Sequence, residues 1–463
     1  MAIAERPKGP MSRIVGLYQM LMRRYVEHFF PDATLEACGD RSFINLDPPR
    51  RTSIFDVRAE QDGLGLEIEL FRTRYMLSPG SPSPFLPSEK RLVEAALRVL
   101  DRRFRSIYDT EAHLDDTLEF EAADQVIAEY LNTPSPVRIP AALEALRAAA
   151  LSTYENRRVS TGALLLGTAE DPAYPARRNP PGAPRYSIRL SAIKSFHKIC
   201  DGINTLYVVD RHGDLAWPVD IARWAERVQG HEPLAIPCPG LYQPHAKATR
   251  TGDHLVLVLT PAQQIKVFAR GTAKFVYGDA RWRLLDVPAK YALWRQALGT
   301  THPVELGDRL FQAALNLAEH RHGALFVVLR DPESSVSQLL APGDRMHGEV
   351  AEDDPDDPEN LAPRLAKRSL HHLARGQTIN DLDDRVLEAL AGIDGAVVTD
   401  RAGDLISYGA ILRVSHEMSL APRAVEGART TAALAASHHG PVLKVSEDGH
   451  LTMFLGGRRV WEL

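Results

Sequence analysis

The chain has 463 residues, which is too long for a single ordinary core, so we expect two to four domains. Its 44% hydrophobic and 25% charged residues are typical of a soluble globular protein, and its formal net charge of -5 argues against a generally basic, nucleic-acid-binding one. Three cysteines lie far apart without a CxxC pair, which argues against a zinc motif or a disulfide scaffold and favours a reducing compartment.

Residues 1–137 are predicted to form a small α/β domain with a sensory or packing role. Met11–Phe30 is typical of an amphipathic helix, because charged side chains interrupt a stretch that would have to be mostly apolar to cross a membrane. The alternation of Leu64–Phe71 predicts a half-buried strand, and helices are predicted from Ser88 and over Leu114–Tyr130. Because no signal-peptide pattern is present either, we expect a cytoplasmic protein with no membrane partner.

Two later segments of the chain repeat one pattern. A helix predicted over Ala141–Tyr154 precedes an apolar run, and a helix predicted over Asp308–His320 precedes a similar run. Residues 202–221 and 392–411 then align without a gap at an offset of 190, and nine of these 20 positions are identical. A predicted strand–turn–strand block follows in each copy, over Val256–Thr260 with Ile265–Phe268 and over Val442–Ser446 with Leu451–Phe454.

Three blocks in the same order favour an internal duplication over the alternative that hairpins with polar turns simply look alike. We therefore predict a multi-domain α/β fold in which residues 138–302 and 303–463 are similar units, each with a mixed sheet flanked by helices. The second unit is longer before its Gly-Ile block, and the extra length includes the acidic run Glu352–Glu359. Such runs are usually solvated loops, and we assign it no metal site.

Two motifs of the last unit could carry chemistry together. Asp394, Gly395 and Ala396 open an apolar β run, which places a carboxylate at a sheet edge where glycine allows close approach of a ligand; an ordinary turn is the alternative. Gly427 precedes a helix start that carries Arg429. Free N–H groups and the helix dipole favour phosphate there, and arginine adds a planar donor fork, although a capped helix with a surface arginine has the same pattern.

A third motif, Ser446-Glu447-Asp448, occupies a predicted hairpin turn. It could bind a metal ion or a hydroxyl group, and an ordinary acidic turn is the alternative. In this order the three motifs resemble those of the diadenylate cyclase family, whose signatures are Asp-Gly-Ala, Gly-Thr-Arg-His-Arg-Ala-Ala and Ser-Glu-Glu. The resemblance covers about a third of the chain and extends to Gly323-Ala324-Leu325 and Gly409-Ala410-Ile411-Leu412.

The resemblance implies a domain that condenses two ATP molecules into cyclic di-AMP with Mg²⁺ or Mn²⁺, under the control of an N-terminal sensor region. It implies a homodimer through residues 305–463, in which two sites face each other. Asp394 would help to deprotonate the attacking ribose hydroxyl and would hold the metal ion, and Arg429 and Glu447 would complete the catalytic set. The nucleotide-binding residues would be Gly395, Ala396, Gly409, Leu412, Gly427, Thr430, Thr431 and Ser446.

The second motif departs from the family pattern at three positions. Ala428 replaces the threonine, and Thr430 and Thr431 replace the histidine and the second arginine. Losing one group that stabilises the developing charge commonly lowers the rate roughly 100- to 1,000-fold. A catalytically degenerate sensor of ATP or a cyclic dinucleotide therefore stays open beside the cyclase. A structural interaction module without nucleotide affinity is the third alternative.

The earlier unit departs further from the family pattern. Asn204 and Thr205 replace the aspartate and the glycine of the first motif, and residues 240–249 offer no arginine before the next strand. This predicts a degenerate unit that keeps the fold and has lost the site. DNA-scanning members of the family carry a further DNA-binding region after the cyclase domain, whereas this sequence ends at Leu463 after the last predicted strand, so we expect no DNA partner.

Overall fold

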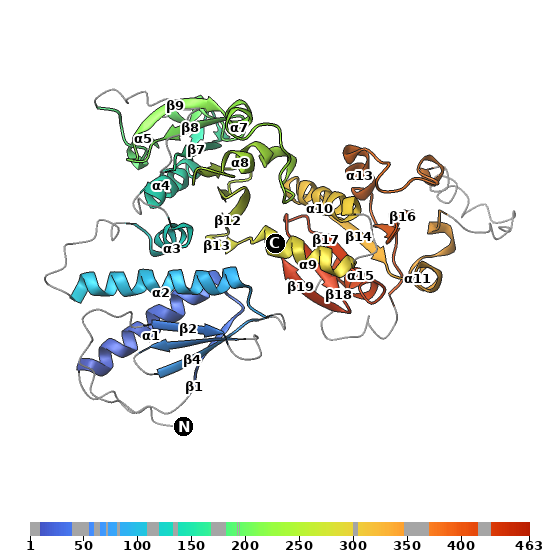
Figure 1. Ribbon diagram of the computed structural model, residues 1–463, viewed down its shortest axis with the longest axis horizontal. Coiled ribbons are helices and arrows are strands. Elements are labelled where there is room, and N and C mark those ends of the chain that lie inside the picture. The colour runs from blue at the N-terminus through green and yellow to red at the C-terminus, as the bar shows by residue number, and fades with distance from the viewer. Residues whose placement is uncertain are drawn as a thin grey trace. The chain divides into compact units, whose positions relative to one another are not determined.

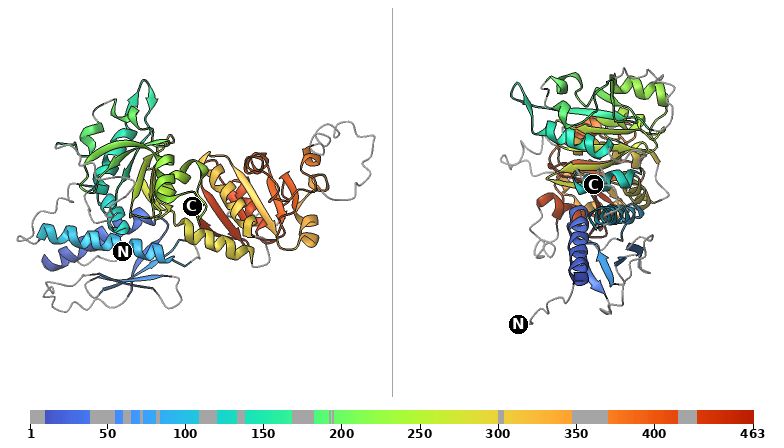
Figure 2. Two further views of the ribbon diagram at one scale, coloured as in Figure 1. Left: turned by 45° about the horizontal axis from the view of Figure 1, so that its top comes forward. Right: turned by 90° about the vertical axis from the view of Figure 1, so that its left-hand side faces the viewer.

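A computed structural model describes residues 10–38, 55–59, 65–70, 73–80, 84–108, 120–132, 138–167, 182–191, 193, 195–299, 304–346, 370–414 and 427–463. The chain divides into two compact units, one of residues 1–233 and 244–286 and the other of residues 234–243 and 287–463. Both units combine helices with β-sheets, and each contains one large mixed sheet (Figures 1 and 2). Among the helices of the described ranges, none has the length and apolarity needed to cross a membrane.

The first unit contains a four-stranded sheet in the order β1-β4-β3-β2 and a seven-stranded sheet in the order β13-β12-β11-β10-β7-β8-β9. Its helices include α1 (Pro10–Phe29), α2 (Pro87–Tyr108), α3 (Ala122–Leu131), α4 (Arg138–Ala150), α5 (Ile188–Ser191), α6 (Phe196–Ile199), α7 (Ile221–Gln229) and α8 (Gln243–Ala248). Its strands include β1 (Thr34–Cys38), β2 (Phe55–Ala59), β3 (Leu66–Leu70), β4 (Thr73–Ser78), β5 (Thr153–Tyr154), β6 (Arg157–Arg158), β7 (Thr161–Leu165), β8 (Thr205–Val209), β9 (Leu215–Asp220), β10 (Leu255–Leu259), β11 (Ile265–Ala269), β12 (Thr272–Gly278) and β13 (Arg281–Leu284).

The second unit is built on one six-stranded sheet in the order β16-β15-β14-β17-β18-β19. Its helices include α9 (Val287–Leu298), α10 (Val304–Glu319), α11 (Pro332–Leu339), α13 (Asp384–Ala391) and α15 (Ala428–Ala436). Short 3₁₀ helices lie at η2 (Gly240–Tyr242) and η3 (Pro342–Asp344). Its strands include β14 (Ala324–Leu329), β15 (Ala396–Asp400), β16 (Leu405–Ala410), β17 (Val442–Val445), β18 (Leu451–Leu455) and β19 (Arg458–Glu462). The acidic run Glu352–Glu359 lies outside the described residues.

The two large sheets share one strand topology. In the first, β7 lies between the parallel strand β8 and the antiparallel strand β10, and in the second, β14 lies between the parallel β15 and the antiparallel β17. Antiparallel pairs β8–β9 and β15–β16 extend one side, and the predicted strand–turn–strand blocks are confirmed as the hairpins β10–β11 and β17–β18. The turns between β8 and β9 and between β15 and β16 are also alike. The N–H of Asp214 donates to Oδ1 of Asp210, and the N–H of Asp404 donates to Oδ1 of Asp400, each at 2.9 Å.

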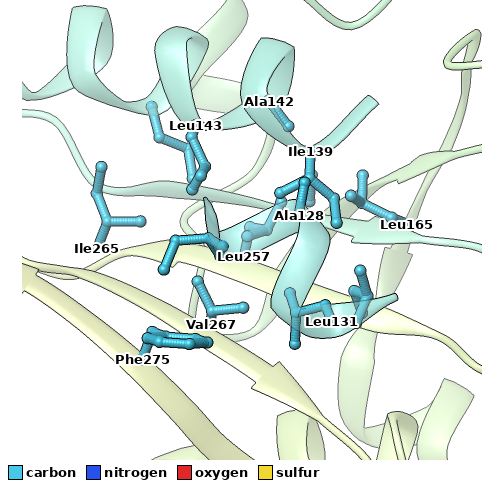
Figure 3. Packing of buried hydrophobic residues seen from close by; sticks show 14 of the residues in the cluster. Ala128, Leu131, Ile139, Ala142, Leu143, Leu165, Leu257, Ile265, Val267 and Phe275 are labelled. Carbon is cyan, nitrogen blue, oxygen red and sulfur yellow. The ribbon is translucent and has the colours of Figure 1, made fainter. Parts of the chain in front are cut away.

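The N-terminal elements follow the predicted pattern. Residues Tyr18, Met22 and Val26 of α1 are buried at helical spacing, so the amphipathic helix is confirmed. One set of α2 side chains packs with α1 against the four-stranded sheet, and the buried residues of this cluster include Val93, Leu97 and Leu100. Another set, Leu92, Ala95, Ala96 and Val99, joins the core of the larger sheet. In Figure 3, side chains of α3 and α4 face those of β10, β11 and β12 in this core.

One predicted helix is wrong at its C-terminal end. The helix expected over Ala141–Tyr154 ends at Ala150, and Thr153–Tyr154 instead pairs with β6. Glu155 and Asn156 have φ values of 49° and 60°, the left-handed conformation that two-residue hairpin turns require, and asparagine tolerates it well. The helix predicted over Leu114–Tyr130 begins later, because Phe120 and Glu121 are not helical and α3 starts at Ala122 with Glu121 as its N-cap; residues 114–119 lie outside the described ranges.

Acid is expected to destabilise the first unit through His245. The ring is fully buried, and Nε2 lies 2.8 Å from the carbonyl oxygen of Gly202, which fits a neutral ring donating from Nε2. Burial lowers the pKa of His245 to about 4 from its ordinary 6.5, so the unfolded chain binds the proton more readily. The contribution of His245 is therefore complete above pH 6.5 and is lost progressively as the pH falls towards 4, by roughly 3 kcal/mol.

Urea unfolding between pH 7 and 4 tests this dependence by comparing the wild type with His245→Gln, whose amide can still donate to the Gly202 carbonyl. We expect the free energy of unfolding to fall more steeply in the wild type than in the variant. Equal slopes would contradict the role given to His245.

Candidate functional site

The topology of the second unit brings the three sequence motifs to one edge of the six-stranded sheet. Gly323 directly precedes β14, and Asp394 lies two residues before β15, which runs parallel to β14. Strand β17 is antiparallel to β14, with Val445 paired to Ala324, so Glu447 follows β17 at the same edge. Strand order and direction therefore place Asp394 and Glu447 on the two sides of the start of β14.

Arg429, in the first turn of α15, connects these two acids. Its Nη1 donates a hydrogen bond to Oε1 of Glu447 at 2.8 Å, and its Nη2 lies 3.7 Å from Oδ1 of Asp394. The side chains of Asp394 and Glu447 are 89% and 73% exposed, whereas that of Arg429 is 37% exposed. The guanidinium thus lies between two solvent-accessible carboxylates at the N-terminus of a helix, and all three groups predicted to be catalytic lie together.

The absence of a side chain at Gly323 makes room for Arg429. A Cβ atom added at Gly323 would collide with Nη1 of Arg429 and would lie 2.7 Å from its Cζ. Gly323 belongs to the predicted Gly-Ala-Leu segment. Glycine at this position permits the guanidinium of Arg429 to lie against the start of β14.

Two further glycines position the Asp394 loop. Gly395 has φ of 120° and Gly409 has φ of 61°, and a Cβ atom on Gly395 would collide with the backbone of Gly409. A Cβ atom on Gly409 would lie 3.6 Å from the carbonyl oxygen of Asp394. Both predicted residues therefore lie beside Asp394, where they allow the backbones to approach closely and leave its carboxylate at the surface.

Other predicted residues take supporting positions. Ala396 and Leu412 are buried in an apolar cluster to which α11 and α15 both contribute. The side chain of Ser446 accepts a hydrogen bond from the N–H of His450 at 3.1 Å, and the Ser446 N–H donates to the His450 carbonyl at 2.9 Å. Ser446 therefore closes the turn that presents Glu447.

The first turn of α15 also contacts a residue that sequence reasoning missed. Gly427 is the N-cap, and its carbonyl accepts hydrogen bonds from the N–H groups of Thr430 at 2.8 Å and Thr431 at 3.3 Å. The Thr430 side chain is buried, and its Oγ1 accepts a hydrogen bond from Nζ of Lys444 at 2.8 Å. The signal for Lys444 in the sequence is a single charged residue in the apolar strand β17.

A divalent cation fits this site only if the substrate supplies further ligands. Within the described ranges, no group of three or more His, Cys, Asp or Glu side chains is arranged to hold a metal ion. Mg²⁺ is usually bound through one or two carboxylates together with substrate phosphates, and Asp394 and Glu447 are exposed carboxylates at this edge. These residues suit a cation that arrives with a triphosphate.

The corresponding edge of the first unit has a different arrangement. Asn204, at the position of the aspartate, donates from Nδ2 to Oδ2 of Asp201 at 2.8 Å. Oδ1 of Asp201 accepts from the N–H groups of three following residues, and these hydrogen bonds lower its pKa although burial opposes them. The buried ring of His245 occupies the neighbouring position against Gly202. The loop of the first unit is thus held by internal hydrogen bonds, whereas the corresponding loop of the second unit presents an exposed acid paired with an arginine.

Comparisons with known proteins identify no family for this chain. No family model matches the chain, and no curated protein matches it. Among solved structures, a hypothetical membrane spanning protein from Bacillus cereus is 20% identical, with 37% of this chain and 69% of that chain covered and a TM-score of 0.25. A double mutant of DacA from Staphylococcus aureus is 16% identical, with 34% of this chain and 87% of that chain covered and a TM-score of 0.22. Likenesses of this size carry no argument about family or function.

Proposed function

We propose that the second unit binds ATP at the edge formed by Asp394, Arg429 and Glu447 and condenses two ATP molecules into cyclic di-AMP. The observation that carries the proposal is the contact of Arg429 with both acids at the N-terminus of α15. A helix N-terminus and a guanidinium provide N–H donors and positive charge for phosphates. A carboxylate within 4 Å of that guanidinium lies where a ribose hydroxyl next to the phosphates can reach it.

The proposed reaction needs a base and a charged phosphate site. The 3′-hydroxyl of one ATP attacks the α-phosphorus of the other, and a new P–O bond forms as the bond to pyrophosphate breaks. Asp394 accepts the hydroxyl proton, and Arg429 stabilises the negative charge that spreads over the phosphate oxygens. A second attack in the opposite direction closes the ring and releases the second pyrophosphate.

The proposal includes a homodimer through the C-terminal unit. Each site holds one ATP, and the reaction joins two, so two sites must face each other. The exposure of Asp394 and Glu447 supports this arrangement, since both carboxylates are accessible to a second copy and its nucleotide. Mg²⁺ or Mn²⁺ bound with the triphosphate would neutralise phosphate charge. The first unit, whose corresponding loop lacks the acid–arginine pair, would act as a sensor region, and the protein would work in the cytoplasm without DNA or a membrane as partner.

A nucleotide sensor without turnover is the second candidate, and Thr430 is the observation that favours it. Its side chain is a buried hydroxyl, hydrogen-bonded to Lys444, so residue 430 itself offers no exposed basic group for the reacting phosphate. Purified protein incubated with ATP and Mg²⁺ or Mn²⁺ separates the candidates when products are resolved by mass spectrometry. Cyclic di-AMP supports the cyclase, and ATP binding without product supports the sensor. Absence of ATP binding would reject both and favour a structural module.

Replacing Gly323 with alanine should weaken ATP binding without unfolding the protein. The added methyl group requires the flexible end of Arg429 to move, while the backbone of Gly323 does not need a positive φ. We expect ATP affinity to fall about tenfold or more, because a hydrogen bond to a charged group contributes about 1.5–3 kcal/mol. Calorimetric titration with ATP measures the affinity, and the thermal midpoint should change little. Unchanged ATP affinity would show that the position of Arg429 does not matter for binding.

A further inference from the structure

The local charge at the proposed site does not favour a triphosphate. Asp394 and Glu447 are both close to Arg429, so the three side chains together carry a charge of about −1 at neutral pH. ATP brings several more negative charges to the same edge. A further cation near the first turn of α15 would therefore strengthen triphosphate binding substantially.

Lys444 has the position that this requires. In the sheet it pairs with Leu325 on β14 and with Thr452 on β18, so it lies in the central part of the sheet rather than at its margin. Its Nζ donates to Oγ1 of Thr430, the residue that follows Arg429. The lysine is half-buried, and its Nζ lies 6.0 Å from the centroid of the Phe454 ring. An ammonium group in such surroundings is screened less by water than one on an open surface.

We infer that Lys444 is a phosphate-binding residue that supplies the second positive charge of the site, an inference that rests on the proposed function. Thr430 holds the ammonium group at the first turn of α15, the turn that also carries Arg429. Phosphate oxygens bound at the helix N-terminus are then close to two cations from different elements, one on α15 and one on β17. The ligand class is a nucleoside triphosphate.

Calorimetric titration of the full chain with Mg·ATP at several salt concentrations tests this role. Lys444→Gln removes the charge and is expected to weaken ATP binding about 10- to 100-fold, and to reduce the dependence of affinity on salt. Lys444→Arg keeps the charge and should restore most of the affinity. Arg458→Gln removes one positive charge from an exposed position on β19 and serves as the matched control, with affinity close to that of the wild type.

The outcomes distinguish this inference from the proposed function. ATP binding by the wild type with unchanged affinity in Lys444→Gln overturns the inference and leaves the proposed function in place. Weaker binding with an unchanged salt dependence and no rescue by Lys444→Arg assigns Lys444 a purely structural role and also overturns it. Failure of the wild type to bind ATP overturns both. Thermal unfolding of each variant shows whether the second unit remains folded.

Discussion

The Asp394→Asn variant is expected to lose cyclic di-AMP production while it still binds ATP. Asparagine preserves the size of the side chain but cannot accept the proton of the ribose hydroxyl, and a general base typically contributes 100- to 10,000-fold to a rate, roughly the loss expected here. The side chain is exposed, and its Oδ1 lies 3.7 Å from Nη2 of Arg429 in a long, solvent-accessible ion pair, so the substitution should cost little stability. Product formation is measured by mass spectrometry and ATP affinity by calorimetry.

Asp383→Asn is the matched control for this experiment. Asp383 is an exposed acid at the N-cap of α13, where its side chain makes no capping hydrogen bond and asparagine caps equally well. This variant should keep full activity. Full activity of Asp394→Asn would remove the general-base role from Asp394, and simultaneous loss of ATP binding would show that its carboxylate serves binding instead of proton transfer.

Asp124→Ala is expected to produce the largest loss of stability in the first unit. The side chain is fully buried, and Oδ1 accepts hydrogen bonds from Nη1 of Arg147 at 2.8 Å and from Nε1 of Trp282 at 3.1 Å. The second guanidinium nitrogen pairs with Oδ2, so α3, α4 and β13 meet at this carboxylate. Removing it leaves Arg147 largely buried without its main partner, which typically costs about 3–5 kcal/mol. Urea denaturation measures the effect.

Two comparison variants identify the cause of that loss. Arg98→Ala removes an exposed ion pair with Glu129, at 2.8 Å, and should cost less than about 1 kcal/mol. The double variant Asp124→Leu with Arg147→Met replaces the buried pair by apolar groups and should recover most of the stability lost in Asp124→Ala. A double variant that is no more stable than the single one would show that the hydrogen bond donated by Trp282 to Asp124 matters more than the unpaired charge.

The sequence was sufficient to predict the parts of the site that lie in local motifs. An Asp-Gly pair before an apolar run, a glycine before a helix start and an acidic turn each have a local pattern, and the strand order of the sheet places all three at one edge. The repeated block was predictable for the same reason, since the turn around Asp400 and that around Asp210 depend on neighbouring residues only.

Features that depend on contacts between distant elements could not be predicted in this way. Lys444 reads as an ordinary polar position in a strand until the register places it under the first turn of α15. The buried pair of Asp124 and Arg147 depends on how α3 and α4 pack together, and the sequence gives no periodic signal for it. The short hairpin after α4 was missed because an Ala-rich helical pattern continues almost up to it, whereas the helix ends at Ala150 and two residues with positive φ form the hairpin turn.

The space that Gly323 leaves for Arg429 has a consequence for comparing diverged sequences. A side chain at position 323 displaces the guanidinium of an arginine at position 429, so substitutions at these two positions should be correlated across related chains. A related chain can preserve this geometry if it retains the glycine before the central strand and the arginine in the first turn of the helix. The geometry then persists even where the Asp394 motif, which lies between them in the sequence, has changed. Searching for the pair is therefore more discriminating than searching for either residue within its own short motif.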